Sequence, residues 1–263
     1  MKYALVTGAS SGIGLEYARQ LAAQQYSILV VSNQREANEQ VAASLSAEFQ
    51  VEAVPLYADL SCDDAAQTLY NYCQEHHIDV HVLVSNAGIL HFGKLIHTDE
   101  RVIDRIIAIH CTTPIKLCKL FGADMARRHE GYILLMSSMT AWTPLPTMSL
   151  YGSTKTLLKN FGYSLWYELK PEGVHVTTVF PSAVDTSFYE IDSRARRTLK
   201  ALGLIISPQK LVKGALRALF AGKRRHIPDL WTRIEIGLSR LTPTWLFRLL
   251  LRLPAIQRLL ARL

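Results

Sequence analysis

Apolar and polar residues alternate along this chain in blocks that predict a parallel β-sheet covered by helices. Short apolar runs, typical of buried strands, occur at 2–6, 27–31, 51–56, 80–85, 131–137 and 174–180, and a further short strand is expected at 225–228. Between them, apolar residues recur at helical spacing near 15–22, 35–48, 62–76, 99–128, 150–170 and 208–221. This order predicts an α/β fold, a doubly wound parallel sheet in three layers, whose ligands bind at the carboxyl ends of the strands.

A glycine-rich turn, TGASSGIG at 7–14, joins the first expected strand to the first expected helix. Gly8 permits a tight turn, Gly12 allows the backbone to approach a pyrophosphate, and Gly14 allows the helix to pack near the strand. The free N–H groups at the start of the helix then bind the anion. The turn therefore predicts nucleotide binding through Gly8, Ser10, Ser11, Gly12, Ile13 and Gly14.

Tyr151 and Lys155 lie four residues apart, and Ser138 precedes the tyrosine by thirteen. Positions i and i+4 of a helix share a face, so an ammonium there can stabilise an ionised phenol. A free tyrosine has a pKa of about 10, and acid–base work near neutral pH requires that stabilisation. The pair by itself also fits an exposed tyrosine and a solvated lysine. The glycine-rich turn is what favours the catalytic interpretation.

Five motifs in register resemble the short-chain dehydrogenase/reductase family over about residues 2–228. They are Thr7-Gly8-x-x-x-Gly12-x-Gly14, Asn86-Ala87-Gly88, Ser138, Tyr151-x-x-x-Lys155 and Pro181-x-x-x-x-Thr186. The resemblance implies a Rossmann-like fold and hydride transfer between C4 of a nicotinamide and a carbonyl carbon. It further implies that Tyr151 exchanges the proton, Lys155 lowers the tyrosine pKa and binds the ribose, and Ser138 holds the carbonyl oxygen.

Further cofactor contacts are expected from the same resemblance. The residues concerned are Asp59 and Leu60 beside the adenine, Asn86, Ala87 and Gly88 along the cofactor, Pro181, and Thr186 at the carboxamide. Asp59 also fits a residue that caps a helix. We expect Tyr151 and Lys155 to contact the cofactor as well.

The residues after the second strand decide between NAD and NADP, because a carboxylate there binds the ribose hydroxyls and a basic residue accepts a 2′-phosphate. This chain has no carboxylate at that strand end, and Ser32, Asn33 and Arg35 are candidates for a phosphate. Arg35 also fits a solvated helix start. NADP(H) is therefore the favoured cofactor and NAD(H) the alternative.

The chain departs from the family pattern at two positions. Ser182 follows Pro181 where the family usually has glycine. His110 stands where the family has an asparagine that anchors a proton-relay water. Imidazole can donate and accept hydrogen bonds, so we hypothesise that His110 serves in the relay, the alternative being a purely structural histidine.

Composition bounds the kind of protein. The chain has 263 residues, of which 49% are hydrophobic, which suits one folded domain with a substantial core. We expect no signal peptide and no membrane-spanning helix. The four cysteines lack Cys-x-x-Cys spacing, which predicts reduced thiols, no metal site and a cytoplasmic protein.

The positive charge is concentrated at the C-terminal end. Residues 223–263 hold nine Lys and Arg against two Asp and Glu, so the remainder of the chain is balanced at twenty of each. We therefore divide the chain into a catalytic domain, 1–228, and a basic amphipathic helical tail, 229–263. The segment 242–263 fits peripheral contact with the cytoplasmic membrane face. Alternatively, it could pack on a sister subunit or on residues 187–207, which we expect to form a lid over the substrate. Leucine dominates the segment 242–263, which disfavours nucleic-acid binding.

The substrate is expected to be apolar. The predicted lid, 187–207, and the loop after Ser138 are rich in apolar residues, with basic residues interspersed in the lid; these residues could equally pack the lid itself. The sequence thus predicts an NADP(H)-preferring reductase of an apolar or lipid-like ketone, in the class of 3-ketosphinganine, 3-oxoacyl or steroid substrates. The chain is expected to form a homo-oligomer through 99–128 and 150–170. The alternative is a nucleotide-binding regulatory or scaffold protein.

Overall fold

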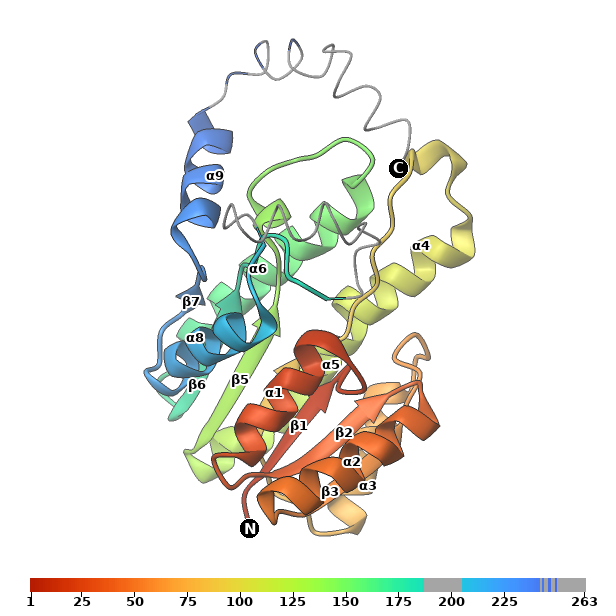
Figure 1. The fold of residues 1–263 in the computed structure, drawn as a ribbon, viewed down its shortest axis with the longest axis vertical. Coiled ribbons are helices and arrows are strands. Elements are labelled where there is room, and N and C mark those ends of the chain that lie inside the picture. Colours follow the sequence, from red (N-terminus) through yellow and green to blue (C-terminus); the bar gives the residue numbers. More distant parts are fainter. Residues whose placement is uncertain (187–204, 242, 244–245, 247–248, 250–263) are drawn as a thin grey trace.

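The computed structural model describes residues 1–186, 205–241, 243, 246 and 249. The chain forms a parallel sheet in the order β3-β2-β1-β4-β5-β6-β7, and the predicted doubly wound α/β fold is confirmed (Figure 1). The strands are β1 (Tyr3–Thr7), β2 (Ser27–Ser32), β3 (Ala53–Tyr57), β4 (Val80–Ser85), β5 (Gly131–Met136), β6 (Val174–Val179) and β7 (Arg225–His226).

Helices cover both faces of the sheet. They are α1 (Gly12–Ala22), α2 (Arg35–Phe49), α3 (Ala65–Glu75), α4 (Glu100–Ile107), α5 (Thr113–Arg128), α6 (Ser149–Leu169), α8 (Pro208–Phe220) and α9 (Leu230–Leu241). Two short 3₁₀ turns, η1 (Leu95–His97) and η3 (Met139–Ala141), lie in loops. One core joins α1, α2 and α8 to the sheet, and a second joins α3, α5 and α6 to the opposite face. Because both faces are covered, successive residues of the central strands are buried.

The sheet topology creates a crevice at one place. β1 pairs with β2 on one side and with β4 on the other, so the chain crosses the sheet after β3 before it continues with β4. The loops that follow β1 and β4 therefore diverge at their carboxyl ends. In open α/β sheets this switch point is where ligands bind.

The helix expected at 99–128 is interrupted. A π-helical turn, η2 (Ala108–Thr112), separates α4 from α5 and contains His110. A π turn inserts one extra residue into the helix and often marks a functional site. The stretch Glu100–Arg128 is long and apolar enough to cross a membrane, with a mean hydropathy of 1.3. Since 56% of its apolar window is buried inside the protein, we interpret it as a core helix.

Several expectations lie outside the described residues. Most of the predicted lid, 187–204, and most of the tail beyond Leu241 belong to this group. At the end of the lid, Ile205 and Ile206 are buried, and Ile206 forms a β-bridge with Val184. These two residues therefore pack the core. The described part of the tail forms α9, which the apolar pattern did not predict as a separate helix.

Two helical glycines differ in the space beside them and yield a matched prediction. A Cβ on Gly162 of α6 would lie 2.2 Å from Thr178 Oγ1 and 2.9 Å from Leu135 Cδ1, whereas a Cβ on Gly237 of α9 would meet nothing within 4 Å. We expect Gly162→Ala to lower the free energy of unfolding by about 1–3 kcal/mol through overpacking. Gly237→Ala should not lower it, and helix propensity favours a gain of up to about 1 kcal/mol.

Urea denaturation followed by circular dichroism measures both changes. The two variants serve as controls for each other, because both replace glycine by alanine inside a helix. Equal urea midpoints for the two variants would contradict the proposed tight contact between α6 and β6.

Candidate active site

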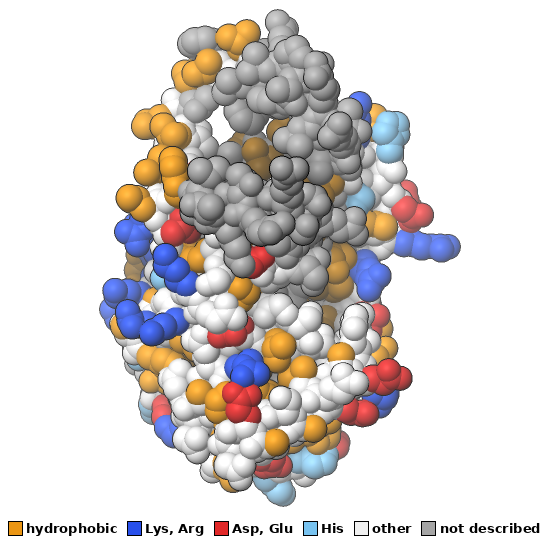
Figure 2. Space-filling model, in the orientation of Figure 1, with side chains coloured by type: hydrophobic (Ala, Val, Ile, Leu, Met, Phe, Trp, Pro, Cys, Tyr) orange, Lys and Arg blue, Asp and Glu red, His pale blue; other side chains and the backbone are white. Residues whose placement is uncertain are grey.

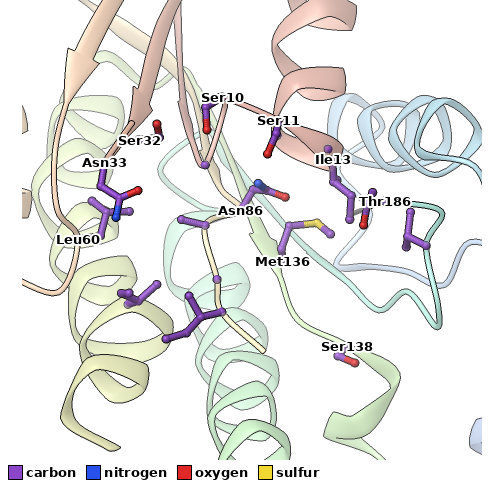
Figure 3. A pocket seen from close by; sticks show the side chains of 18 of the residues that line it. Ser10, Ser11, Ile13, Ser32, Asn33, Leu60, Asn86, Met136, Ser138 and Thr186 are labelled. Atoms are coloured by element: carbon purple, nitrogen blue, oxygen red, sulfur yellow. The ribbon is translucent and has the colours of Figure 1, made fainter. Parts of the chain in front are cut away.

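A cavity of about 480 Å³ opens at the carboxyl ends of the central strands. Figure 3 shows Ser10, Ser11 and Ile13 along one side of it, and Ser32, Asn33 and Leu60 along another. Every residue predicted to bind cofactor lines this cavity except Arg35, and so do Ser138, Tyr151 and Lys155. The structure thus gathers the predicted residues in one place, while their roles in binding and catalysis stay predictions. The sequence pattern gave no signal for Gln34, Ile89, Arg105, Ile109 or Met136, which also line it.

The glycine-rich turn is held by contacts that only glycine permits. Gly8 and Gly12 have positive φ angles of 69° and 57°. A Cβ on Gly14 would lie 2.0 Å from Gly8 O and 2.7 Å from Asn86 Nδ2. The start of α1 is therefore pressed against the turn, with its N–H groups at the cavity.

Thr7 and Asn86 join this turn to the end of β4. Thr7 Oγ1 accepts hydrogen bonds from the backbone N–H of Asn86 (2.9 Å) and of Ala87 (3.0 Å). Asn86 Nδ2 in turn donates to Thr7 O at 3.0 Å. Asn86 thus fixes the spacing of the two loops that border the crevice, and Figure 3 shows it between the two sides of the cavity.

The predicted 2′-phosphate residues differ in their placement. Ser32 Oγ donates to Asn38 Oδ1 at 2.5 Å and accepts from Gln34 N at 3.1 Å, so its hydroxyl is engaged within the protein. Arg35 lies outside the cavity, with its guanidinium carbon 5.0 Å from the centre of the Tyr57 ring. Asn33 is left at the cavity, beside Gln34.

Asp59 does not cap a helix, because Asp64 stands at the N-cap of α3, but its carboxylate holds a turn. Its Oδ1 accepts from Ser61 N at 3.0 Å and from Ser61 Oγ at 2.7 Å, which holds the turn after β3. These hydrogen bonds lower the pKa of the Asp59 carboxyl, so it is a stable carboxylate. Asp59 also lines the cavity.

Tyr151 and Lys155 lie on α6 and face the same cavity, as the helical spacing predicted. Lys155 Nζ lies 5.5 Å from the centre of the Tyr151 ring and donates to Met136 O at 2.9 Å. Burial lowers the pKa of the Lys155 ammonium to about 8. A buried lysine therefore lies beside Tyr151 at the cavity.

The two adjacent serines have different contacts. Ser138 Oγ accepts from Thr140 N at 3.2 Å and caps the turn η3, which leaves its hydroxyl proton available at the cavity. Ser137 Oγ donates to Lys155 O at 2.7 Å and thereby ties β5 to α6. The placement agrees with the choice of Ser138 as the substrate-facing serine.

His110 is fully buried in the π turn and does not line the cavity. Its Nε2 accepts from Ile89 N at 3.0 Å, so the neutral ring carries its proton on Nδ1. Nδ1 lies 2.9 Å from Thr154 Oγ1, whose own proton goes to Tyr151 O at 2.8 Å. Burial, together with the charge of Lys155, lowers the pKa of His110 to about 2.

His110 is therefore a neutral residue that links the π turn to α6. Its ring stands edge-to-face with that of Tyr151, with centres 5.6 Å apart. A Cβ on Gly88 would lie 3.1 Å from His110 Nε2 and 3.7 Å from Lys155 Nζ, so glycine there lets both groups approach one loop. Thr154, which the sequence pattern did not single out, completes this network.

The segment after β6 accommodates the departure at Ser182. Ser182 does not have a positive φ, so its backbone does not require glycine. Thr186 lies beside the glycine-rich turn, next to Ile13 in Figure 3, and its Cγ2 is 3.5 Å from where a Cβ of Gly12 would stand. A second cavity of about 470 Å³ lies between α6 and the loop after Ser138, and Trp142, Leu145 and Met148 line it.

A sequence profile of the family described as short chain dehydrogenase matches residues 2–196. The chain belongs to this family. The resemblance inferred from the five motifs is thereby confirmed.

Relatives of this short-chain dehydrogenase include lipid and steroid enzymes. It is 30% identical to the very-long-chain 3-oxoacyl-CoA reductase of Phaeosphaeria nodorum over 82% of this chain and 63% of that protein. It is 27% identical to the enzyme of the same name from Bos taurus, over 94% of this chain and 77% of that protein. It is 31% identical to 17-beta-hydroxysteroid dehydrogenase type 3 of Danio rerio, over 71% of this chain and 62% of that protein. The chain spans slightly less than two thirds of the length of several such relatives.

Solved structures agree with the fold. A short-chain dehydrogenase from Sphingobium yanoikuyae in complex with NADPH superimposes with a TM-score of 0.79 at 26% identity, over 92% of this chain and 95% of that one. A bulky-bulky ketone specific alcohol dehydrogenase from Comamonas testosteroni superimposes with a TM-score of 0.77 at 25% identity, over 92% of this chain and 93% of that one.

The His110 network yields a prediction with two readouts. If His110 serves the relay, His110→Ala should change the pH profile of kcat, and His110→Asn should change it less, because an amide also donates and accepts. The second readout is stability. Unfolded histidine binds a proton below about pH 6.5, whereas folded His110 does so only near 2. Wild-type protein should therefore lose stability as pH falls from 6.5, and His110→Asn should lose less of it.

Steady-state kinetics and urea denaturation at pH 7 and pH 5 separate the two roles. Unchanged pH profiles of kcat in both variants, together with the predicted difference in stability, would mean that His110 is structural only.

Proposed function

We propose that this short-chain dehydrogenase is an NADP(H)-preferring oxidoreductase that reversibly reduces an apolar, lipid-like ketone to a secondary alcohol. One observation carries the proposal. Ser138, Tyr151 and Lys155 line the same cavity as the glycine-rich turn. Proton exchange and dinucleotide binding therefore meet in one site.

The cavity suits a nicotinamide dinucleotide. The positive φ of Gly8 and Gly12 and the close contact at Gly14 form a cradle with free N–H groups, which suits a pyrophosphate. In this proposal Asp59 and Leu60 would border the adenine, Asn86, Ala87 and Gly88 the middle of the cofactor, and Pro181 and Thr186 the carboxamide. All of them line the cavity. The bound nicotinamide supplies or accepts the hydride.

The residues of this chain supply the rest of the reaction. Ser138 would donate a hydrogen bond to the carbonyl oxygen and keep its proton, and Tyr151 would transfer its phenolic proton to the alkoxide as it forms. The buried Lys155 would place its charge beside the phenol, and Met136 O holds it there. Ser137 positions this part of α6 through Lys155 O.

The NADP preference is supported by the end of β2, where no carboxylate lies at the cavity. Asn33 is the best placed of the predicted phosphate ligands, and Gln34 lies beside it. Arg35 would have to leave the Tyr57 ring to reach a phosphate. The proposed substrate class is a 3-oxoacyl, 3-ketosphinganine or steroid ketone. The names of the relatives support the 3-oxoacyl and steroid members of it, and Trp142, Leu145 and Met148 in the second cavity support an apolar substrate.

Turnover tests this proposal. We expect the wild-type protein to oxidise NADPH, faster than NADH, with medium- and long-chain ketones from a panel that includes steroids. Tyr151→Phe should reduce kcat by about 10²–10⁴-fold, because it removes the proton donor, and should leave NADPH binding in place.

Tyr167→Phe is the matched control, because Tyr167 is exposed on the same helix as Tyr151. The kcat of this variant should equal that of wild type. NADPH binding by the wild-type protein without turnover of any ketone would instead favour a regulatory or scaffold protein.

Oligomer formation and membrane contact complete the proposal. Exposed Ile107 on α4 and Leu157 on α6 support a homo-oligomer formed through these helices. The basic, leucine-rich segment 242–263 supports peripheral contact at the cytoplasmic face of a membrane. The proposed boundary between catalytic domain and tail is 228/229.

Flotation with anionic liposomes tests the membrane contact. The full chain should float with the vesicles, and a chain ending at residue 228 should not, because it lacks the basic apolar tail. Retained NADPH binding would show that the shorter chain is folded. Equal flotation of the two chains would contradict contact through the tail.

A further inference from the structure

Helix α9 carries its apolar face on the outside of the protein. Leu230 is 71% exposed, Ile234 39% and Leu241 81%, and these residues recur at spacings of four and seven, on one side of the helix. Trp231, 49% exposed, borders the same side. A surface helix of a soluble protein normally turns such a face towards the core.

The opposite side of α9 is the one that packs on the protein. Thr232 is fully buried and donates to the Asp229 carboxylate, which also accepts from Thr232 N and caps the helix. Ile236 is buried, and Ser239 Oγ accepts from Thr143 Oγ1 at 2.7 Å. These contacts fix the orientation of α9, so the outward position of the apolar face is determined by the fold.

Positive charge lies beside this face. Lys223, Arg225 and Arg233 are exposed, and residues 223–241 hold five Lys and Arg against two Asp and Glu. Figure 2 shows a run of hydrophobic side chains along the edge where α9 lies, with Lys and Arg gathered directly below it. Apolar side chains bordered by cations and a tryptophan match the layers of an anionic lipid surface.

We propose that the exposed face of α9 docks on an anionic lipid bilayer, with Leu230, Ile234 and Leu241 entering the acyl boundary. Lys223, Arg225 and Arg233 contact the headgroups. A second copy of the chain fits less well, because two-fold pairing of this face would bring the same cations towards each other.

Helix α9 lies between the docked face and the proposed substrate side of the enzyme. Thr143, which binds Ser239 of α9, belongs to the loop after Ser138 that lines the second cavity. Docking would therefore hold this loop at the bilayer, where a lipid-like ketone is concentrated. This purpose rests on the proposed function, whereas the docking itself does not, because it is measured without turnover.

Liposome flotation of the full chain tests the inference, with the tail left intact. The vesicles are phosphatidylcholine alone, or phosphatidylcholine with phosphatidylserine. Leu230→Ser, Ile234→Ser and Leu241→Ser are combined in one variant, and Arg233→Gln with Lys223→Gln in another. Ile96→Ser is the control, because Ile96 is an isoleucine 83% exposed outside α9.

We expect wild type and Ile96→Ser to float with the anionic vesicles. The vesicle partition coefficient of the triple variant should be lower than that of wild type by about tenfold or more. The charge variant should bind anionic vesicles more weakly than wild type, just as added salt should weaken the binding of wild type. NADPH binding should be unchanged in all of them, since α9 does not line the cofactor cavity.

Three results would overturn the inference. The first is that the wild-type protein floats with neither kind of vesicle. The second is that the triple variant floats as well as wild type does. The third is that neither protein binds lipid, and light scattering shows a dimeric wild type and a monomeric triple variant. The last would assign the face to a second copy of the chain. Because flotation and ketone turnover are separate measurements, failure of the docking would be distinguishable from failure of the proposed activity.

Discussion

The close approach of the β1–α1 turn to the end of β4 is the contact on which the site depends. Gly14 lies against Gly8 O and Asn86 Nδ2 at distances that exclude a Cβ. Thr7 and Asn86 then hydrogen-bond across the switch point of the sheet. This contact holds the crevice open to a fixed width, with the α1 N–H groups on one side and the β4 loop on the other. The side of the cavity formed by the two loops follows from that spacing.

Helix α6, which carries Tyr151 and Lys155, is positioned by a second set of contacts, and these involve buried polar groups. Lys155 Nζ and Lys155 O bind Met136 O and Ser137 Oγ at the end of β5. On the other side, His110 connects Ile89 N to Thr154, and Thr154 donates a hydrogen bond to Tyr151 O. Buried polar groups are costly unless they are fully hydrogen-bonded, and here each is paired. The histidine therefore contributes position whether or not it also takes part in proton transfer.

Much of the site could be predicted from the sequence, because its signals are local. The glycine spacing, the helical spacing of Tyr151 and Lys155, and the placement of motifs after strands all follow from short stretches of chain. The predictions were less complete where the deciding contact is distant in sequence. Arg35 lies on the Tyr57 ring outside the cavity, and Ser32 is occupied by Asn38. Thr154 has a role only because a π turn brings His110 to it.

The α/β fold, the family and most of the residues that gather at the cavity follow from local patterns in the sequence, since alternating apolar periods and glycine spacing constrain the backbone directly. The tertiary structure alone decided which way helices and side chains face. It set the tautomer of His110 through Ile89 N–H, separated Ser137 from Ser138, and turned the apolar side of α9 outwards. An amphipathic pattern specifies that a helix has an apolar face. Whether that face meets the core or the surroundings depends on which neighbours bind its other side, here Asp229 and Thr143.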